Sequence, residues 1–512
     1  MVMSRAPLGL SAPLVRVEVH LGAGLPSFVI VGLPEAVVRE SKERVRAALL
    51  TSGFEFPIAR ITVNLSPADL PKQGGRFDLP IAIGILAASG QVPARALRGR
   101  EFFGELSLSG GLRETPKLLP ALIAGIRDGN ELIVPSANAL EADVVAGSRI
   151  RLADHLRGVC RALQDETLWA EATTGLGSPA VLQAARTAVP DLVDIRGQFA
   201  AKRALEIAAA GEHGLLLVGP PGAGKTLLAQ RLPGLLPPLL AHEVLEVASL
   251  ESAAGRRPSA AALRPFRNPH HTASVAALLG SSDCRPGEVS LAHRGVLFLD
   301  ELPEFARNAL EALREPLESG VVMLARAQRS CAFPARFQLV AAMNPCPCGY
   351  HGDPRGRCHC STAQVARYRN RISGPLLDRI DLHVEIQALP PQHLLAERHG
   401  DVEASTDVAR RVAAARQIQM CRQGLLNARL NIPEAQRWCR LDTESRALLG
   451  AAIERLNVSA RAHDRILKIA RTCADLAGEG EVRAAHVAEA LSLRGYDRGP
   501  THALQAQAGL TC

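Results

Sequence analysis

Gly219-Pro-Pro-Gly-Ala-Gly-Lys-Thr226 is the stretch of this chain that decides its fold. It directly follows the apolar run Leu215–Val218 and directly precedes Leu227-Leu-Ala-Gln-Arg-Leu232. This order predicts a buried strand, a glycine loop and the start of a helix, which is the context that a P-loop requires. Backbone N–H groups of such a loop surround phosphate oxygens, and the helix N-terminus adds the positive end of its dipole.

The P-loop predicts ATP and Mg²⁺ as cofactors. We expect Lys225 to reach the β- and γ-phosphates and the Thr226 hydroxyl to ligate Mg²⁺. The other residues of the loop are expected to bind the nucleotide mainly through their backbone: Gly219, Pro220, Pro221, Gly222, Ala223 and Gly224.

Two further apolar runs end in polar side chains. Val296-Leu-Phe-Leu299 leads into Asp300-Glu301, and the run that begins at Phe337 ends at Asn344. Because the carboxyl ends of parallel strands meet at one edge of a sheet, these groups are expected to surround a phosphate. Asp300 would then hold the Mg²⁺ shell, Glu301 would activate the attacking water and Asn344 would orient it. A strand-end cap is the alternative role for Asn344.

Composition narrows the class of protein. With 512 residues, the chain has room for roughly three domains. No apolar run approaches the ~20 residues of a membrane span, and the N-terminus lacks the pattern of a signal peptide. Eleven cysteines in such a long chain indicate thiols or metal rather than a disulfide framework. We therefore expect a cytoplasmic location and no membrane partner. A net charge of +8 is compatible with a polyanionic partner without proving one.

Hydrophobic periodicity predicts an α/β fold with a helical C-terminal region. Strands are expected at Val15–Leu21 and Ser27–Val31, and helices at Ala404–Cys421 and Ser459–Ala477. The predicted parts are an α/β domain (1–165), a polar linker (166–192), a parallel α/β P-loop domain with a cysteine-rich insertion at 346–360 (193–389), and a helical domain (390–512).

Four cysteines form two Cys-x-Cys pairs that are nine residues apart: Cys346, Cys348, Cys358 and Cys360. Four soft ligands within 15 positions can close a tetrahedral zinc site, which makes Zn²⁺ a further candidate cofactor. Four reduced, unconnected thiols are the alternative. The other seven cysteines are scattered and are interpreted as small buried hydrophobic residues.

The motifs resemble the magnesium-chelatase-like ATPases of the AAA+ superfamily. The similar segments are Asp194–Gln198, Asn268–Thr272, Pro286–Gly295 and Leu299–Phe305. Within that group, Ala341–Gly349 and Ser373–Asp381 resemble the ComM (YifB) family, and the resemblance covers essentially the whole chain. It implies a homo-hexameric ring, an AAA+ core with a helical lid, and a DNA motor that performs branch migration on branched or single-stranded recombination intermediates during natural transformation.

The resemblance also implies roles for several arginines. Arg379 matches the arginine finger that reaches the neighbouring subunit's nucleotide. The alternative is that Arg379 pairs with Asp378 or Asp381 on the surface. Arg461 matches sensor 2, with Arg465 as the alternative. Residues 317–326 and 330–337 read as a hairpin, which in the family is the pre-sensor-1 hairpin facing the pore. Arg326 and Arg329 near its tip are therefore the predicted DNA contacts.

The front domain resembles the Lon-protease-like, ribosomal-S5-like fold. In the turn Lys72–Asp78, Arg76 stands where the serine nucleophile of such proteases would be. Without a nucleophile acyl transfer has no attacking atom, so a proteolytic assembly is disfavoured. A phosphate contact and a structural turn both remain open for this segment. The two leading hypotheses are a DNA translocase and a chelatase-type ATPase that remodels a protein or metal-cofactor partner.

Overall fold

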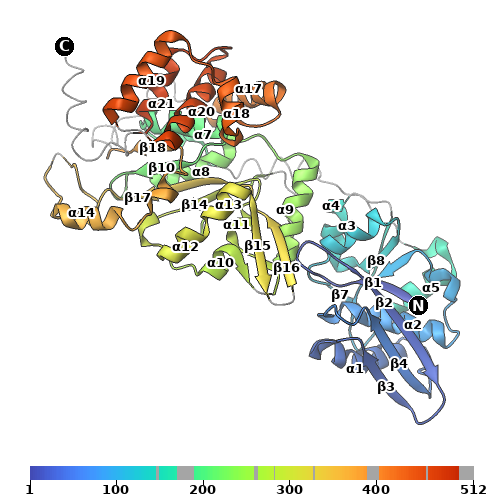
Figure 1. The fold of residues 1–512 in the computed structure, drawn as a ribbon. Coiled ribbons are helices and arrows are strands. Elements are labelled where there is room, and N and C mark those ends of the chain that lie inside the picture. Colours follow the sequence, from blue (N-terminus) through green and yellow to red (C-terminus); the bar gives the residue numbers. More distant parts are fainter. Residues whose placement is uncertain are drawn as a thin grey trace.

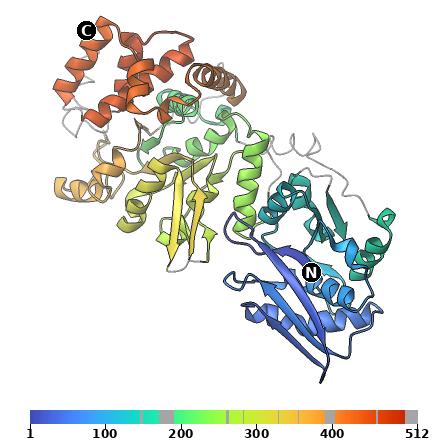
Figure 2. The same cartoon turned by 45° about the vertical axis from the view of Figure 1, so that its right-hand side comes forward.

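A computed structural model describes residues 1–145, 149–169, 190–258, 263–281, 283–326, 329–353, 355–388, 403–456 and 459–494. It consists of an N-terminal α/β domain, a central parallel α/β domain and a C-terminal helical domain. Figures 1 and 2 show the central domain between the other two, with the N-terminal domain at one end of an elongated molecule. The predicted α/β fold class with a helical C-terminal region is confirmed.

The N-terminal domain is built on a seven-stranded mixed sheet in the order β3-β4-β2-β1-β5-β8-β9. The strands are β1 (Val2–Arg5), β2 (Leu14–Gly22), β3 (Ser27–Val31), β4 (Arg60–Ser66), β5 (Arg100–Phe102), β8 (Glu131–Pro135) and β9 (Ile150–Ala153), with a small ribbon of β6 (Glu105–Leu106) and β7 (Leu112–Arg113). The helices are α1 (Ala36–Thr51), α2 (Asp78–Ala88), α3 (Leu119–Arg127), α4 (Ala139–Val145) and α5 (Leu156–Gln164). Helix α2 is buried over most of its length because its sequence is apolar on every side.

The central domain contains a five-stranded parallel sheet. Its order is β11 (Phe266–Arg267), β14 (Val296–Leu299), β17 (Gln338–Met343), β10 (Leu215–Val218) and β18 (Leu382–Glu385). Strands β10, β14 and β17 are buried at every residue, since helices cover both faces of a parallel sheet. The helices of this domain are α7 (Phe199–Gly211), α8 (Lys225–Leu235), α9 (Ala241–Ala253), α10 (Val275–Leu279), α11 (Glu288–Leu291), α12 (Arg307–Ala312), α13 (Arg314–Ser319), α14 (Thr362–Arg369) and α15 (Gly374–Leu377). The P-loop follows β10. Strands β17 and β14 lie between β10 and β11, which is the outermost strand on that side.

The expected hairpin is present, formed by β15 (Val321–Arg326) and β16 (Arg329–Pro334). It begins later than predicted, because residues 317–319 lie in α13 and Gly320 ends that helix in the left-handed conformation. Nearby, β12 (Gly280–Ser281) pairs with β13 (Arg285–Pro286). A disulfide between Cys284 and Cys331 joins this second ribbon to the hairpin. The interpretation of these two cysteines as separate hydrophobic residues was therefore wrong.

The helical domain comprises α17 (Ser405–Gln423), α18 (Ile432–Trp438), α19 (Thr443–Leu456), α20 (Ala460–Ala477) and α21 (Ala484–Ser492). It shares one hydrophobic core with α7, α8 and the central sheet. Ion pairs reinforce this contact, such as Arg203 with Glu489 at 2.8 Å. Residues 170–189 of the predicted linker and residues 389–402 at the predicted border of the helical domain lie outside the described residues, so the domain boundaries stay predictions.

The N-terminal domain packs on the central domain at α9. Leu119, Val144 and Ala248 form a buried cluster there, and the Ser252 hydroxyl donates a 2.7 Å hydrogen bond to the Glu141 carboxylate. The loop between β1 and β2 also reaches the central domain, where Leu8 packs against the cluster that contains the disulfide. The front domain therefore contacts the hairpin region directly.

Arg76 has a structural position. Its side chain is buried and donates hydrogen bonds to the backbone carbonyls of Pro116 and Lys117. Burial lowers the pKa of this guanidinium to about 10. Of the two roles left open by the sequence, the structural turn agrees with this burial, whereas a phosphate contact would need an exposed side chain.

Candidate nucleotide-binding site

The P-loop surrounds a cavity of about 370 Å³ at the carboxyl edge of the central sheet. The cavity is lined by the predicted residues Pro221, Gly222, Ala223, Gly224, Lys225, Thr226, Asp300, Glu301 and Asn344, together with Leu227 and Met343. Gly224 has a φ of +91°, which a residue with a side chain rarely adopts, and it caps the N-terminus of α8. The helix therefore directs its N-terminal N–H groups toward the cavity, as phosphate binding requires.

The lysine of the loop is held at the cavity by three acceptors. Lys225 Nζ lies 2.7 Å from the Gly219 carbonyl, 3.0 Å from the Pro220 carbonyl and 2.9 Å from Asn344 Oδ1. Burial lowers the pKa of Lys225, while the carboxylates of Asp300 and Glu301 act in the opposite direction. The P-loop lysine and the strand-end amide, which were predicted to surround one phosphate, thus lie within hydrogen-bond distance of each other.

The hydroxyl and the acid expected at the Mg²⁺ shell are also adjacent. Thr226 Oγ1 donates a 2.7 Å hydrogen bond to Asp300 Oδ2. The other oxygen of Asp300 accepts a 2.9 Å bond from the backbone N–H of Glu301. A hydroxyl beside a carboxylate at the N-terminus of α8 is an oxygen-rich donor set, and Mg²⁺ prefers such ligands. The residues present therefore fit a nucleotide-bound Mg²⁺.

Glu301 has an additional neighbour that the sequence analysis missed. His271 Nδ1 lies 3.2 Å from Glu301 Oε2. Glu301 itself has a φ of +54°, in the left-handed region, which is uncommon for a residue with a side chain. The motif Asn268–Thr272 contained His271, but no spacing rule connects it with an acid 30 positions later. Only the pairing of β11 with β14 brings the two segments together.

Comparisons with known proteins identify the family. Residues 191–394 match the family model for magnesium chelatase subunit ChlI, residues 17–138 match a further ChlI model, and residues 402–494 match the ChlI C-terminal model. Competence protein ComM of Haemophilus influenzae is 49% identical to the chain, with 97% of each protein covered. The chain belongs to the ComM/YifB family of magnesium-chelatase-like AAA+ ATPases.

Other members of the ComM/YifB family are similarly close. The uncharacterised protein YifB of Escherichia coli is 47% identical, again with 97% of each chain covered. The uncharacterised protein Mb2921c of Mycobacterium bovis is 44% identical over 96% of this chain and 97% of its own. An ATPase with ATP and Mg²⁺ as cofactors follows from the family together with the cavity described above.

The predicted arginine finger lies at the opposite edge of the sheet from the P-loop. Arg379 lies three residues before β18, which runs parallel to β10, whereas the P-loop follows β10. Arg379 pairs with Glu318 and donates a 2.7 Å hydrogen bond to the Pro375 carbonyl. Its Nε is buried and has no hydrogen-bond partner among the residues that the structure describes. The surface pairing considered from the sequence thus occurs, but with Glu318 and not with Asp378 or Asp381.

The two candidates for sensor 2 differ in their contacts. Arg465 forms an ion pair with Asp381, which also lies 3.0 Å from His213 Nδ1. Burial would raise the pKa of Asp381, but Arg465 and His213 outweigh it and hold the pKa below its ordinary value. Arg461, one turn earlier on α20, is exposed. The contacts therefore leave Arg461 as the candidate that is available to a ligand.

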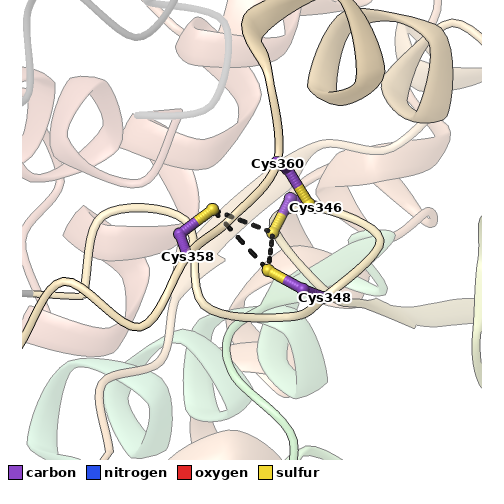
Figure 3. A group of neighbouring side chains, drawn as sticks. All are labelled: Cys346, Cys348, Cys358 and Cys360. Carbon is purple, nitrogen blue, oxygen red and sulfur yellow. Dashed lines mark hydrogen bonds between the residues drawn. The ribbon is translucent and has the colours of Figure 1, made fainter.

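The four clustered cysteines converge. Their sulfur atoms all lie within 4.8 Å of one another, with separations of 3.2 Å for Cys346–Cys348, 3.8 Å for Cys346–Cys358 and 3.6 Å for Cys348–Cys358. Figure 3 shows these three sulfurs facing one another, with Cys360 beside them. A tetrahedral Zn²⁺ with Zn–S bonds of about 2.3 Å holds its sulfurs roughly 3.8 Å apart. The donor set therefore fits one such ion.

The predicted DNA contacts lie at the end of the hairpin. Arg326 pairs with Arg329 as the last pair of the β15–β16 register. The side chains of both residues are outside the part of the chain that the structure describes, so their role stays a prediction. Among the described residues, no helix is long and apolar enough to cross a membrane.

Proposed function

We propose that this chain forms a homo-hexameric ring that uses ATP hydrolysis to move branched DNA, as a branch-migration helicase. The observation that carries the proposal is the similarity to a competence protein over nearly the whole chain. It is supported by the predicted P-loop, Mg²⁺ and water-positioning side chains, which line one cavity. We place this activity in the cytoplasm, where natural transformation would deliver DNA intermediates.

Within one subunit, the carboxyl edge of the sheet binds the nucleotide and prepares the attacking water. Lys225 neutralises phosphate charge, while Thr226 and Asp300 hold Mg²⁺. Glu301 takes the proton of the water, and Asn344 orients that water by a hydrogen bond. Mg²⁺ supplies neutralisation of the charge that develops on the phosphates.

The remaining cationic groups come from the neighbouring subunit. Arg379 lies at the amino edge of the sheet because it precedes β18. Arg461 lies on α20, whose Arg465 pairs with Asp381 at the same edge. A guanidinium supplied in trans stabilises the spreading phosphate charge and couples hydrolysis to ring assembly.

DNA would be held through its phosphates. The chain has only five tyrosines and tryptophans in 512 residues, so stacking on bases contributes little. Arg326 and Arg329 at the end of the hairpin would contact the backbone, and the adjoining N-terminal domain would hold the base of the hairpin in place. Affinity should then fall steeply with salt and depend little on sequence.

The test uses purified protein, ATP and three synthetic DNAs: a four-way junction, a fork and a plain duplex. We expect conversion of the junction into two forked products, and loss of this conversion in Lys225→Ala. Arg326→Ala and Arg329→Ala should hydrolyse ATP without moving strands. If no DNA binds at low salt and none stimulates hydrolysis, the chelatase-type remodelling ATPase becomes the better interpretation.

We also propose that Cys346, Cys348, Cys358 and Cys360 hold one Zn²⁺ per chain. The four sulfurs lie too close together for a cluster of several irons, which would hold thiolates on different irons farther apart. Elemental analysis of protein prepared without an affinity tag measures the metal content directly. A folded chain that contains less than a tenth of one equivalent of zinc would contradict the proposal.

A further inference from the structure

We infer that the metal loop, residues 345–353 and 355–361, holds the P-loop in its ATP-binding shape, so that occupancy of the cysteine site sets the affinity for ATP. The inference rests on the zinc site proposed above and is independent of the DNA-motor function. It assigns the cysteines a role in the nucleotide site, although none of them lines the cavity.

The first observation is a close contact between Gly349 of the metal loop and the ring of Pro221 in the P-loop. Gly349 directly follows Cys348 and is buried. A Cβ placed on Gly349 would lie 2.6 Å from Cδ and 3.1 Å from Cγ of Pro221 in the P-loop. Its φ of +85° also disfavours any residue with a side chain. The metal loop thus packs on the P-loop at a position where only glycine fits.

The second observation is the connection to Asn344. This residue precedes Cys346 by two positions, and its amide oxygen accepts the hydrogen bond from Lys225. The turn that follows is closed by a 2.9 Å hydrogen bond from the Gly349 N–H to the Cys346 carbonyl. The same short turn therefore fixes the amide that contacts the P-loop lysine and the glycine that contacts the P-loop proline.

The third observation is that this loop has little apolar core. Among its described residues, Cys346 is the only apolar side chain that is fully buried. Tyr350 is half-buried beneath the Arg357 guanidinium, and α14 adds a 3.3 Å hydrogen bond from Arg369 to the Pro345 carbonyl. A loop with so little buried surface needs another source of order, and a metal bound by four thiolates from both of its ends supplies it.

The experiment measures zinc content and ATP affinity in the same samples of full-length protein. Zinc is removed with a chelator that is selective for zinc over magnesium, in excess Mg²⁺, and ATP binding is followed with a fluorescent ATP analogue. We expect removal to weaken ATP binding by about tenfold or more, and added Zn²⁺ to restore it. Cys358→Ser should reproduce the loss. Cys421→Ser, which removes an exposed thiol outside the cluster, should not.

Gly349→Ala tests the contact between Gly349 and Pro221 separately from zinc binding. We expect this variant to keep one zinc per chain and still to bind ATP about tenfold more weakly, because the new methyl group displaces Pro221. Unchanged ATP affinity after verified zinc removal would overturn the inference, as would a metal-free chain with full ATP affinity. Tight, zinc-dependent ATP binding by a protein that moves no junction would support the inference and contradict the motor function instead.

Discussion

The two edges of the central sheet carry different groups of the predicted ATPase residues. At the carboxyl edge, Lys225, Asp300 and Asn344 lie around one cavity within a single chain. At the amino edge, Arg379 and Asp381 lie before β18. Because β10 and β18 are parallel and span four residues each, about 13 Å of strand separates the two edges. In the proposed ring, one subunit would bind the nucleotide with one edge and offer Arg379 as an arginine finger from the other.

Removing the arginine of the amino edge should have the largest effect. We expect Arg379→Ala to lower ATP turnover by at least about 10³-fold, since a finger arginine stabilises charge that develops only in the transition state. ATP binding and ring assembly should be retained. Steady-state hydrolysis, nucleotide binding and sedimentation measure these three properties. Arg410→Ala, an exposed arginine on α17, is the matched control, and an equal loss in that variant would argue against a finger.

Glu301, the proposed general base at the carboxyl edge, is tested by Glu301→Gln. This change keeps the shape of the side chain but removes its ability to accept a proton, so turnover should fall by about 10²- to 10⁴-fold with ATP affinity intact. Glu304→Gln, three residues later and paired with Arg371, should retain turnover. Hydrolysis by Glu301→Gln at the parental rate would show that another group is the base.

The ion pair of the amino edge should contribute stability and not chemistry. Asp381→Asn leaves Arg465 without its partner and should lower the free energy of unfolding of the helical domain by about 3 kcal/mol at pH 7. The lowered pKa of Asp381 means that this contribution is present above the ordinary aspartate pKa and is lost as the pH falls. The difference between parent and variant should therefore shrink by about 1 kcal/mol at pH 3.

Guanidinium denaturation, followed by the helical signal at both pH values, measures this difference. Asp378→Asn is the control, because that aspartate lies three residues earlier at the same edge and is more exposed. A difference that stays constant with pH would mean that the charge of Asp381 does not stabilise the fold.

The histidine beside the base should give the smallest effect. His271 contacts one oxygen of Glu301, so His271→Ala should leave ATP affinity unchanged and lower turnover by about threefold to tenfold through poorer orientation. His270→Ala removes the neighbouring ring but keeps the Glu301 pair, and it should lower turnover less. Equal losses in both variants would assign the effect to the loop and not to the contact.

Much of the carboxyl edge was predictable from sequence, because each of its parts is local. The apolar runs at Leu215–Val218 and Val296–Leu299 are observed as strands with these bounds, as is the strand predicted at Ser27–Val31 in the N-terminal domain. Each run is short, apolar and ends in turn or polar residues. Lys225 and Asn344 then meet because parallel strands end at the same edge of the sheet.

The contacts that the sequence did not predict all join distant segments. Cys284 and Cys331 are 47 residues apart in two separate ribbons, and spacing alone cannot select a pair among eleven cysteines. The His271–Glu301 contact depends on which strands are neighbours. The burial of Arg76 depends on a carbonyl 40 residues later. Such pairings follow from the tertiary packing and not from local periodicity.

Mixing two inactive subunits tests most directly whether the active site is divided between the edges of two neighbouring subunits. Lys225→Ala subunits lack the nucleotide-binding edge but keep Arg379, whereas Arg379→Ala subunits have the reverse defect. In mixed rings, some interfaces regain both groups, so ATP hydrolysis should recover above the level of either variant alone. If rings verified to contain both variants show no recovery, Arg379 does not act on the neighbour's nucleotide, and the divided site is wrong.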